Sequence, residues 1–303
     1  MIKQLAFLTL LIAVAGCSRD LPDRVAANSE NVNNIAEAFT GGGDGGQAQE
    51  VLQEPTGWRD LRFTFSTSGD VTIPKLTAAV INKDVGVCAP GGVFPASRKL
   101  VLGNGNAVQF AAVYLDMRNF PLDNEKWVHP DYAADADATI GPFDQKNCVF
   151  LNHVFAMRAS QKLLIKNSDT VGHNTKSDAA PGSPNVQIAA GGETLYDPGG
   201  KAPRGGPVSV SCSAHPWMNA YFLIREDPYN GISNEEGVVE LKNVPTGVDL
   251  EFRVWHELLG NVTTKPNGDY EFKKGKLNLN LEPGDTPFEI NIELDAARLQ
   301  GAL

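Results

Sequence analysis

The sequence has no segment with sustained helical periodicity. It also lacks a glycine-rich phosphate loop, a Cys-x-x-Cys-His haem attachment and any recognisable Ser/His/Asp arrangement. Only 26 lysine and arginine residues stand against 36 acidic ones, and the formal net charge of -10 leaves no broad basic face for phosphates. These absences argue against a mainly helical fold, phosphoryl transfer, c-type haem chemistry and nucleic-acid binding.

The N-terminus carries an export signal. Residues 1–16 pair Lys3 with the apolar run LAFLTLLIAVAG, which is too short to span a membrane as a mature helix. The run ends in VAGC, which resembles the lipobox of bacterial lipoproteins, and this implies that Cys17 becomes the lipid-bearing first residue. Because Ser18 follows rather than Asp, we expect anchoring, through this lipid alone, at the periplasmic side of the outer membrane. The alternative is an ordinary signal peptide with an incidental cysteine.

The rest of the chain is predicted to be all-β. Residues 17–57 are polar, contain a glycine cluster at 41–46 and predict a flexible tether. After Trp58, alternating patterns such as LRFTFST and LEFRVW are separated by turn signals such as KPNGD and EPGD. This pattern indicates β-sandwiches or barrels. We divide this body into a β-rich N-terminal segment (58–143), a central domain (144–227) and a C-terminal module (228–303).

The C-terminal module contains NEEGVVELKNVPTGVDLEFRVWHE, which resembles carboxypeptidase regulatory-like, prealbumin-like modules. The resemblance implies a second, prealbumin-like or Ig-like β-sandwich. About 70 residues remain for it, fewer than such a module usually needs. Strands between Asp60 and Met117 could instead complete this sandwich around an inserted central domain, so both arrangements stay open.

One short loop carries unusual chemistry. In VSVSCSAHPWMNAYFLIRE, Cys212 ends an alternating strand pattern, and His215 and Met218 follow before the next strand begins. Soft sulfur ligands together with imidazole select copper, and a His2Cys plane with a long axial Met is the blue-copper arrangement. A second histidine must then come from another strand. The candidate is His173, which stands 39 residues before Cys212 at the end of KLLIKNSDTVGHN.

With these residues in view, about residues 144–225 resemble a cupredoxin, and the Cys-x2-His-x2-Met spacing is closest to the amicyanin form. The resemblance implies a Greek-key β-sandwich that holds one type 1 copper ion. It implies four ligands: His173, Cys212, His215 and Met218. It further implies that Asn174 braces the loop carrying Cys212, and Ser213 is expected beside it.

Cys88 and Cys148 are left over, and in an oxidising compartment we expect them to form a disulfide. Closing a loop of about 60 residues would contribute about 4 kcal/mol in the chain-entropy model. The alternative is a second metal site made from these two cysteines and His153. His129 and His256, each close to a tryptophan, are expected to be satisfied core or rim histidines.

The cupredoxin resemblance favours an electron carrier. Enzyme activity is not expected, because five histidines with no His-x-His pair do not build the trinuclear copper centre of a multicopper oxidase. We expect single-electron exchange with a redox protein such as a c-type cytochrome or an oxidoreductase. Electrons are expected to pass through the edge of His215, with Pro216 and Trp217 forming a small apolar docking patch. The alternatives are a copper-handling or structural envelope lipoprotein, or a subunit of a larger redox complex.

Overall fold

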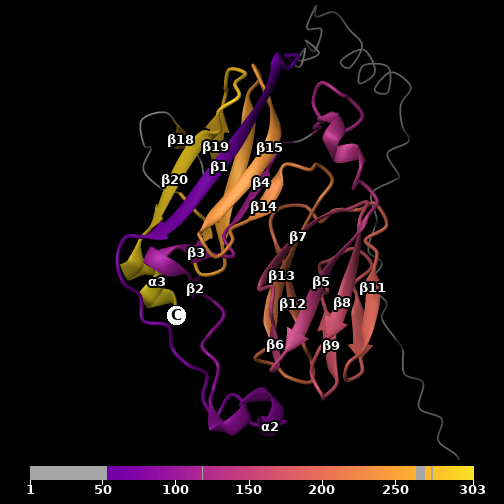
Figure 1. Cartoon of the computed structure of the whole chain (residues 1–303), viewed down its shortest axis with the longest axis vertical. Coiled ribbons are helices and arrows are strands. Elements are labelled where there is room, and N and C mark those ends of the chain that lie inside the picture. The colour runs from indigo at the N-terminus through magenta and orange to yellow at the C-terminus, as the bar shows by residue number, and fades with distance from the viewer. Residues whose placement is uncertain (1–52, 118, 264–269, 274–275) are drawn as a thin grey trace, which may run out of the picture. The chain divides into compact units, whose positions relative to one another are not determined.

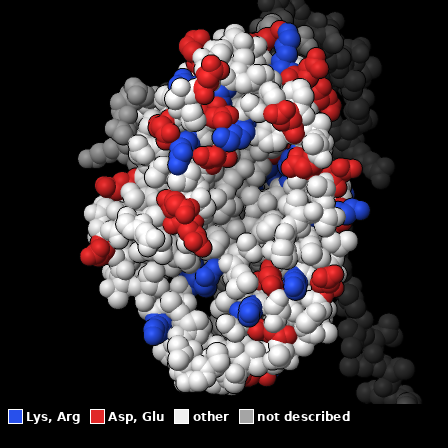
Figure 2. Space-filling view, in the orientation of Figure 1, with Lys and Arg blue, Asp and Glu red and all other residues white. Residues whose placement is uncertain are grey.

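The computed structural model describes residues 53–117, 119–263, 270–273 and 276–303, and strands dominate it (Figure 1). The predicted signal peptide, the lipid site at Cys17 and most of the predicted tether fall in residues 1–52, outside the described part. Within that part, no helix combines the length and the apolar character needed to cross a membrane. On the face shown in Figure 2, lysine and arginine side chains are scattered among acidic ones.

One β-sandwich combines strands from both ends of the described chain. Its first sheet has the order β15-β1-β20, with bounds Val238–Thr246, Gly57–Thr67 and Phe288–Leu294. Its second sheet has the order β14-β4-β16-β19-β18, with bounds Asn230–Ile232, Ala112–Leu115, Leu250–His256, Lys276–Leu279 and Glu271–Lys273, and β17 (Gly260–Asn261) pairs with β16. Strands β1 and β4 of the N-terminal segment therefore lie in the same two sheets as the strands after residue 228.

Alternation explains why these segments form strands. In β1, Leu61, Phe63 and Phe65 are fully buried while the residues between them are partly exposed. This is the two-residue period of a sheet with one face on the core. Strand β1 runs antiparallel to β15 and parallel to β20. The ring of Phe63 lies 6.4 Å from that of Phe252, so the two sheets share one core.

A second β-sandwich lies between β4 and β14 in the sequence. One sheet has the order β10-β9-β12-β13-β7, with bounds Asn185–Ile188, His173–Lys176, Val208–Ser211, Asn219–Arg225 and Val154–Arg158. The other has the order β11-β8-β5-β6, with bounds Glu193–Tyr196, Lys162–Asn167, Thr139–Lys146 and Val149–Phe150. Phe143 and Phe222, one from each sheet, pack with ring centroids 4.9 Å apart in the core between them.

The segment between β1 and β4 crosses to this second sandwich (Figure 1). Its short elements are α2 (Val85–Cys88), η1 (Pro90–Gly92), β2 (Val101–Leu102), η2 (Asn104–Asn106) and β3 (Val108–Gln109). Ile81, Cys88 and Ala89 are buried in the same core cluster as Phe143 and Phe222. The other helices among the described residues are η3 (Pro130–Ala133) and α3 (Ala296–Ala302). The second sandwich is thus covered in part by residues that precede it by 50 positions or more.

Candidate metal centre

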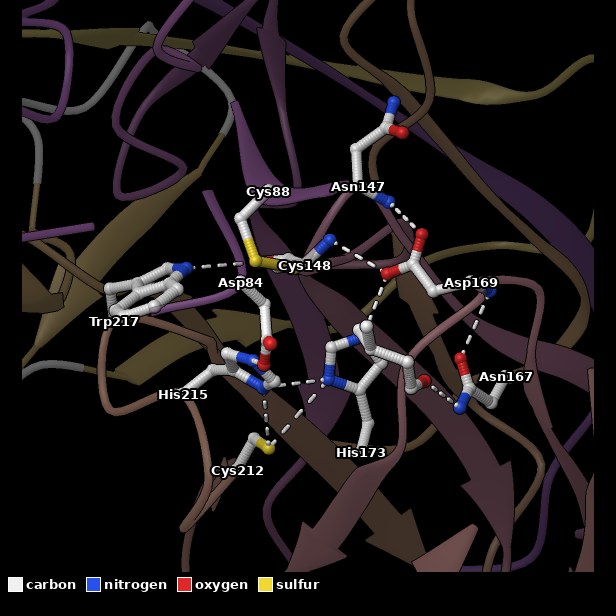
Figure 3. Close-up of a disulfide and its surroundings, with 11 residues drawn as sticks. Asp84, Cys88, Asn147, Cys148, Asn167, Asp169, His173, Cys212, His215 and Trp217 are labelled. Atoms are coloured by element: carbon white, nitrogen blue, oxygen red, sulfur yellow. Dashed lines mark hydrogen bonds and ion pairs between the residues drawn. A yellow bond between two sulfur atoms is a disulfide. The ribbon is translucent and has the colours of Figure 1, made fainter. Parts of the chain in front are cut away.

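Three of the predicted ligands meet inside the second sandwich. His173 Nδ1 lies 2.9 Å from His215 Nδ1, and Cys212 Sγ lies 4.0 and 3.8 Å from these two nitrogen atoms (Figure 3). All three side chains are at most 1% exposed. Metal bonds to imidazole and thiolate are about 2.0 to 2.3 Å long, so ligand atoms around one ion lie roughly 3 to 4 Å apart. The cluster has that size.

Two adjacent strands hold the cluster. Cys212 directly follows β12, and β13 begins at Asn219, so the ligand loop spans the turn of a hairpin. Two backbone bonds close this turn: Cys212 N donates to Met218 O at 3.2 Å, and Met218 N donates to His215 O at 2.9 Å. His173 is the first residue of β9, which pairs with β12. The imidazole from β9 therefore reaches the loop from a separate strand, as the sequence predicted.

Asn174 makes the contacts expected of a brace. Its side-chain oxygen accepts a hydrogen bond from Ser213 N at 2.6 Å, and its Nδ2 donates to Ser213 Oγ at 3.3 Å. Its backbone N–H donates to Cys212 Sγ at 3.4 Å. These bonds fix the start of the loop, and the bond to sulfur stabilises negative charge on the thiolate.

Two carboxylates orient the histidines. His173 Nε2 lies 2.7 Å from Asp169 Oδ2, and His215 Nε2 lies 2.8 Å from Asp84 Oδ2 (Figure 3). A hydrogen bond at Nε2 fixes the tautomer of a metal-binding imidazole and leaves Nδ1 free to bind. Both rings therefore present the same nitrogen to the centre. Sequence reasoning missed both carboxylates, although Asp169 lies only four residues before His173.

Asp169 also holds the neighbouring hairpin. Its carboxylate accepts hydrogen bonds from Asn147 N at 2.6 Å and from Cys148 N at 2.8 Å. Asn147 and Cys148 both have positive φ angles, 52° and 54°, and form the two-residue turn between β5 and β6. Positive φ at both positions is typical of the tight hairpin turn whose twist matches the flanking strands. One carboxylate thus connects His173 to the turn that carries Cys148.

The groups around Cys212 favour its thiolate form. Burial alone would raise the pKa of Cys212, but hydrogen bonds from His173, Asn174 N and His215 lower it to about 6. Burial alone would lower the pKa of His173, but its bonds to Asp169 and Cys212 raise it to about 9. Without metal, the cluster at neutral pH therefore pairs a thiolate with an imidazolium. This combination suits a site where a cation replaces the proton.

Met218, the predicted axial ligand, is 1% exposed and packs in the same core cluster as Cys212. Its backbone bonds to Cys212 and His215 place it at the end of the ligand loop. A buried methionine at the end of the ligand loop is compatible with a weak thioether ligand. The donor set of two imidazoles and one thiolate fits copper better than a hard cation.

The predicted disulfide is present: Cys88 and Cys148 are bonded to each other, with Cα atoms 4.9 Å apart. Neither cysteine is a free thiolate, so the alternative second metal site with His153 is not formed. His153 instead pairs with the carboxylate of Glu257. The disulfide lies against the metal cluster, because the sulfur atoms of Cys88 and Cys148 fall within 4.8 Å of a ring nitrogen of His215.

The ring of His215, through whose edge we expected electrons to pass, is not exposed. The imidazole is fully buried, and its Nε2 is paired with the carboxylate of Asp84. The physical reason is the segment bearing α2, which the disulfide fixes against this end of the sandwich. Pro216 is exposed and Trp217 is half-buried, with its Nε1 donating to Cys148 O at 3.2 Å and its ring 5.2 Å from that of His215.

The two other histidines behave as expected. His129 lies at the N-cap of η3, where its Nδ1 accepts from Asp131 N at 3.3 Å, and its ring packs against Trp58. His256 is 1% exposed, and its Nδ1 accepts from Leu258 N at 3.3 Å. Neither joins a three-ligand cluster among the described residues.

No protein-family model and no curated protein matches the sequence. Among solved structures, the chain is similar to the Cu(I) form of a mutant of amicyanin, with 14% identity, 30% of this chain and 84% of that chain covered, and a TM-score of 0.23. It is similar to a purple cupredoxin from Nitrosopumilus maritimus, with 19% identity, coverages of 29% and 99%, and a TM-score of 0.23. It is also similar to a copper-containing nitrite reductase from Thermus scotoductus, with 16% identity, coverages of 29% and 22%, and a TM-score of 0.24.

At these TM-scores the likenesses assign neither a fold nor a function to the chain. The case for a bound metal therefore rests on the side chains of the cluster.

Proposed function

We propose that this chain is an electron carrier that holds one type 1 copper ion. His173, Cys212 and His215 would hold the ion, with Met218 as a weaker fourth ligand. The observation that carries the proposal is the convergence of two Nδ1 atoms and one sulfur in a buried cluster. Bound copper supplies a one-electron couple between Cu(II) and Cu(I).

The protein's contribution is a rigid, dry ligand set. The bonds from Asp84 and Asp169 hold the two imidazoles, and the Asn174 brace holds the loop that begins at Cys212. The three equatorial ligands are at most 1% exposed, so little water can reorganise around them. A site that changes little between two oxidation states exchanges electrons with a small reorganisation cost. The mixed nitrogen and sulfur set accommodates both states.

The described residues provide one place for a bound metal ion. Every three-ligand cluster of His, Cys, Asp and Glu in the described residues includes His173 or His215. The described part of the chain therefore offers no separate cluster of this kind for a second, catalytic metal. A pure electron carrier needs only the one centre.

Because His215 is covered, we place the route for electrons through Trp217. Its indole ring lies 5.2 Å from the ring of His215 and is half-buried, so it links the cluster to the surface. Exposed Pro216 adjoins it. In this proposal a redox protein, such as a c-type cytochrome or an oxidoreductase, docks on these two residues. Lipid anchoring at Cys17 on the periplasmic side of the outer membrane completes the proposed setting.

Visible absorption of the copper-loaded full chain tests the metal site. We expect an intense thiolate-to-copper charge-transfer band, which Cys212→Ser abolishes. The matched control is His129→Gln, which alters a histidine outside the cluster and should leave the band unchanged. A colourless protein that binds only Cu(I) would favour copper handling over electron transfer.

The docking role has its own test. Trp217→Glu should slow electron exchange with the physiological partner and leave the copper band in place. Leu195→Glu, at an apolar side chain 54% exposed on β11, is the control for added charge. An exchange rate that Trp217→Glu does not change would remove the docking role while the copper site stands.

A further inference from the structure

A cavity of about 180 Å³ lies beside the ligand loop. Trp217 and Met218 form part of its wall, Arg98 and Lys99 come from the segment before β2, and His153 and Glu257 complete its polar lining. The rest of the wall is largely apolar and includes Phe150. The cavity thus joins residues from both sandwiches and the crossing segment, next to the loop that carries the thiolate.

Two buried polar atoms of this lining have no partner. His153 is 3% exposed, and its Nε2 is paired with Glu257, but its Nδ1 makes no hydrogen bond within the described residues. Arg98 donates from Nη2 to Leu151 O at 2.6 Å, yet its Nε is buried without an acceptor among those residues. An unsatisfied buried polar atom costs about 1 to 3 kcal/mol, so native proteins rarely keep one. Two such atoms on one cavity wall mark where a bound molecule would form hydrogen bonds.

The charges define what the occupant must offer. An arginine Nε–H can only donate, so its partner must supply an acceptor oxygen, whereas an imidazole Nδ1 can take either role. Lys99 adds a second positive charge at the same wall. The one carboxylate there, Glu257, is already paired with His153, and it also bonds to the Tyr221 hydroxyl. An anionic oxygen therefore finds two cations and no unpaired negative charge.

The apolar part of the wall and the cavity volume indicate the size of the ligand. An apolar cavity of about 150 Å³ accommodates benzene. We propose that this cavity binds a small organic carboxylate with an apolar body about the size of one ring. The carboxylate accepts a hydrogen bond from Arg98 Nε–H, and the apolar body packs against Phe150, Met218 and Trp217. Binding does not depend on the metal, so this inference goes beyond the proposed electron carrier and can fail or succeed independently of it.

Calorimetric titration of the metal-free full chain with benzoate tests the site. Benzoate is expected to bind, while benzyl alcohol, which has the same ring without the charge, should bind at least about tenfold more weakly, as a charge-assisted hydrogen bond implies. Arg98→Met should weaken benzoate binding by a similar factor. Arg298→Met, which removes an exposed arginine on α3, is the matched control and should change nothing.

A second variant closes the cavity without removing a polar group. Val80 lines it and is 43% exposed, so Val80→Trp can fill the space from the surface without disturbing the core. This variant should abolish benzoate binding even if Arg98→Met fails to fold. The proposal is overturned if benzoate does not bind, if benzyl alcohol binds equally well, or if inorganic phosphate binds in its place. It is also overturned if Val80→Trp leaves the affinity for benzoate unchanged.

Discussion

Replacing Asp84 should weaken copper binding although Asp84 is not a ligand. Its Oδ2 lies 2.8 Å from His215 Nε2, and the imidazole is buried while the aspartate side chain is 34% exposed. Hydrogen bonds to charged groups contribute about 1.5 to 3 kcal/mol, and partial exposure puts this one near the lower value. About 1.4 kcal/mol is a factor of about ten in affinity. Outer-shell partners of metal-bound histidines typically change affinity by about 10- to 100-fold, in agreement with this figure.

The backbone conformation of Asp84 limits which residues can replace it. Asp84 has φ 49° and ψ 36°, a left-handed conformation that glycine adopts without strain and asparagine tolerates better than alanine. Asp84→Gly removes the carboxylate and should lower the affinity for copper about tenfold. Asp84→Asn keeps an oxygen that accepts from His215 Nε2 and should lose less. The difference between the two variants separates orientation of the ring from its charge.

The assay is a competition titration of Cu(I) against a chromophoric chelator, with the full chain and with circular dichroism as a check of folding. Asp178→Ala, at an exposed carboxylate of the same sandwich, is the control and should not change the affinity. An affinity in Asp84→Gly equal to that of the unaltered protein would refute the role of this carboxylate in holding His215. Equal losses in both variants would show that charge, and not orientation, matters.

Two further predictions concern stability. The Cys88–Cys148 disulfide spans 60 residues. Replacing both cysteines by alanine should therefore lower the free energy of unfolding of the metal-free protein by about 4 kcal/mol. Denaturant titration measures this change, and an unchanged midpoint would contradict the prediction. Burial lowers the pKa of His256 to about 4, with His153 adding to the effect and Glu257 opposing it. Because this folded-state pKa lies below the ordinary 6.5, stability is complete above about pH 6.5 and falls by about 3 kcal/mol as the pH drops to about 4. His256→Asn should lose this part of the pH dependence, and identical pH profiles for both proteins would exclude His256 as its source.

Many of the strands could be predicted from local alternation of apolar and polar residues. The alternation of Leu61, Phe63 and Phe65 identifies β1 as a strand with one face on the core, because burial on one side of a pleated strand repeats every two residues. It cannot identify the neighbours of that strand. Strand β1 pairs in parallel with β20, more than 200 positions later, and apolar alternation specifies a face rather than a partner. The arrangement of these strands could therefore not be predicted from the sequence.

The candidate site, too, could be predicted only in part from the sequence. Cys212, His215 and Met218 lie within one turn, so their spacing alone indicates convergence, and the need for a second histidine from another strand pointed to His173. Asp84 is 131 positions from His215, in a segment without a periodic pattern, and no local signal could pair them. The burial of the His215 ring was not predicted, for the same reason.

The disulfide and the metal cluster form one mechanical unit. Cys148 lies in the turn that Asp169 binds, and the same carboxylate orients His173. The other half-cystine, Cys88, lies one helical turn after Asp84, which orients the other histidine; Cys88 N donates to Asp84 O at 2.9 Å. The disulfide therefore fixes the positions of both carboxylates at once. The thiolate does not depend on it, because Cys212 is held by its own hairpin and by Asn174. Breaking the disulfide should accordingly loosen both imidazoles and leave the sulfur in place.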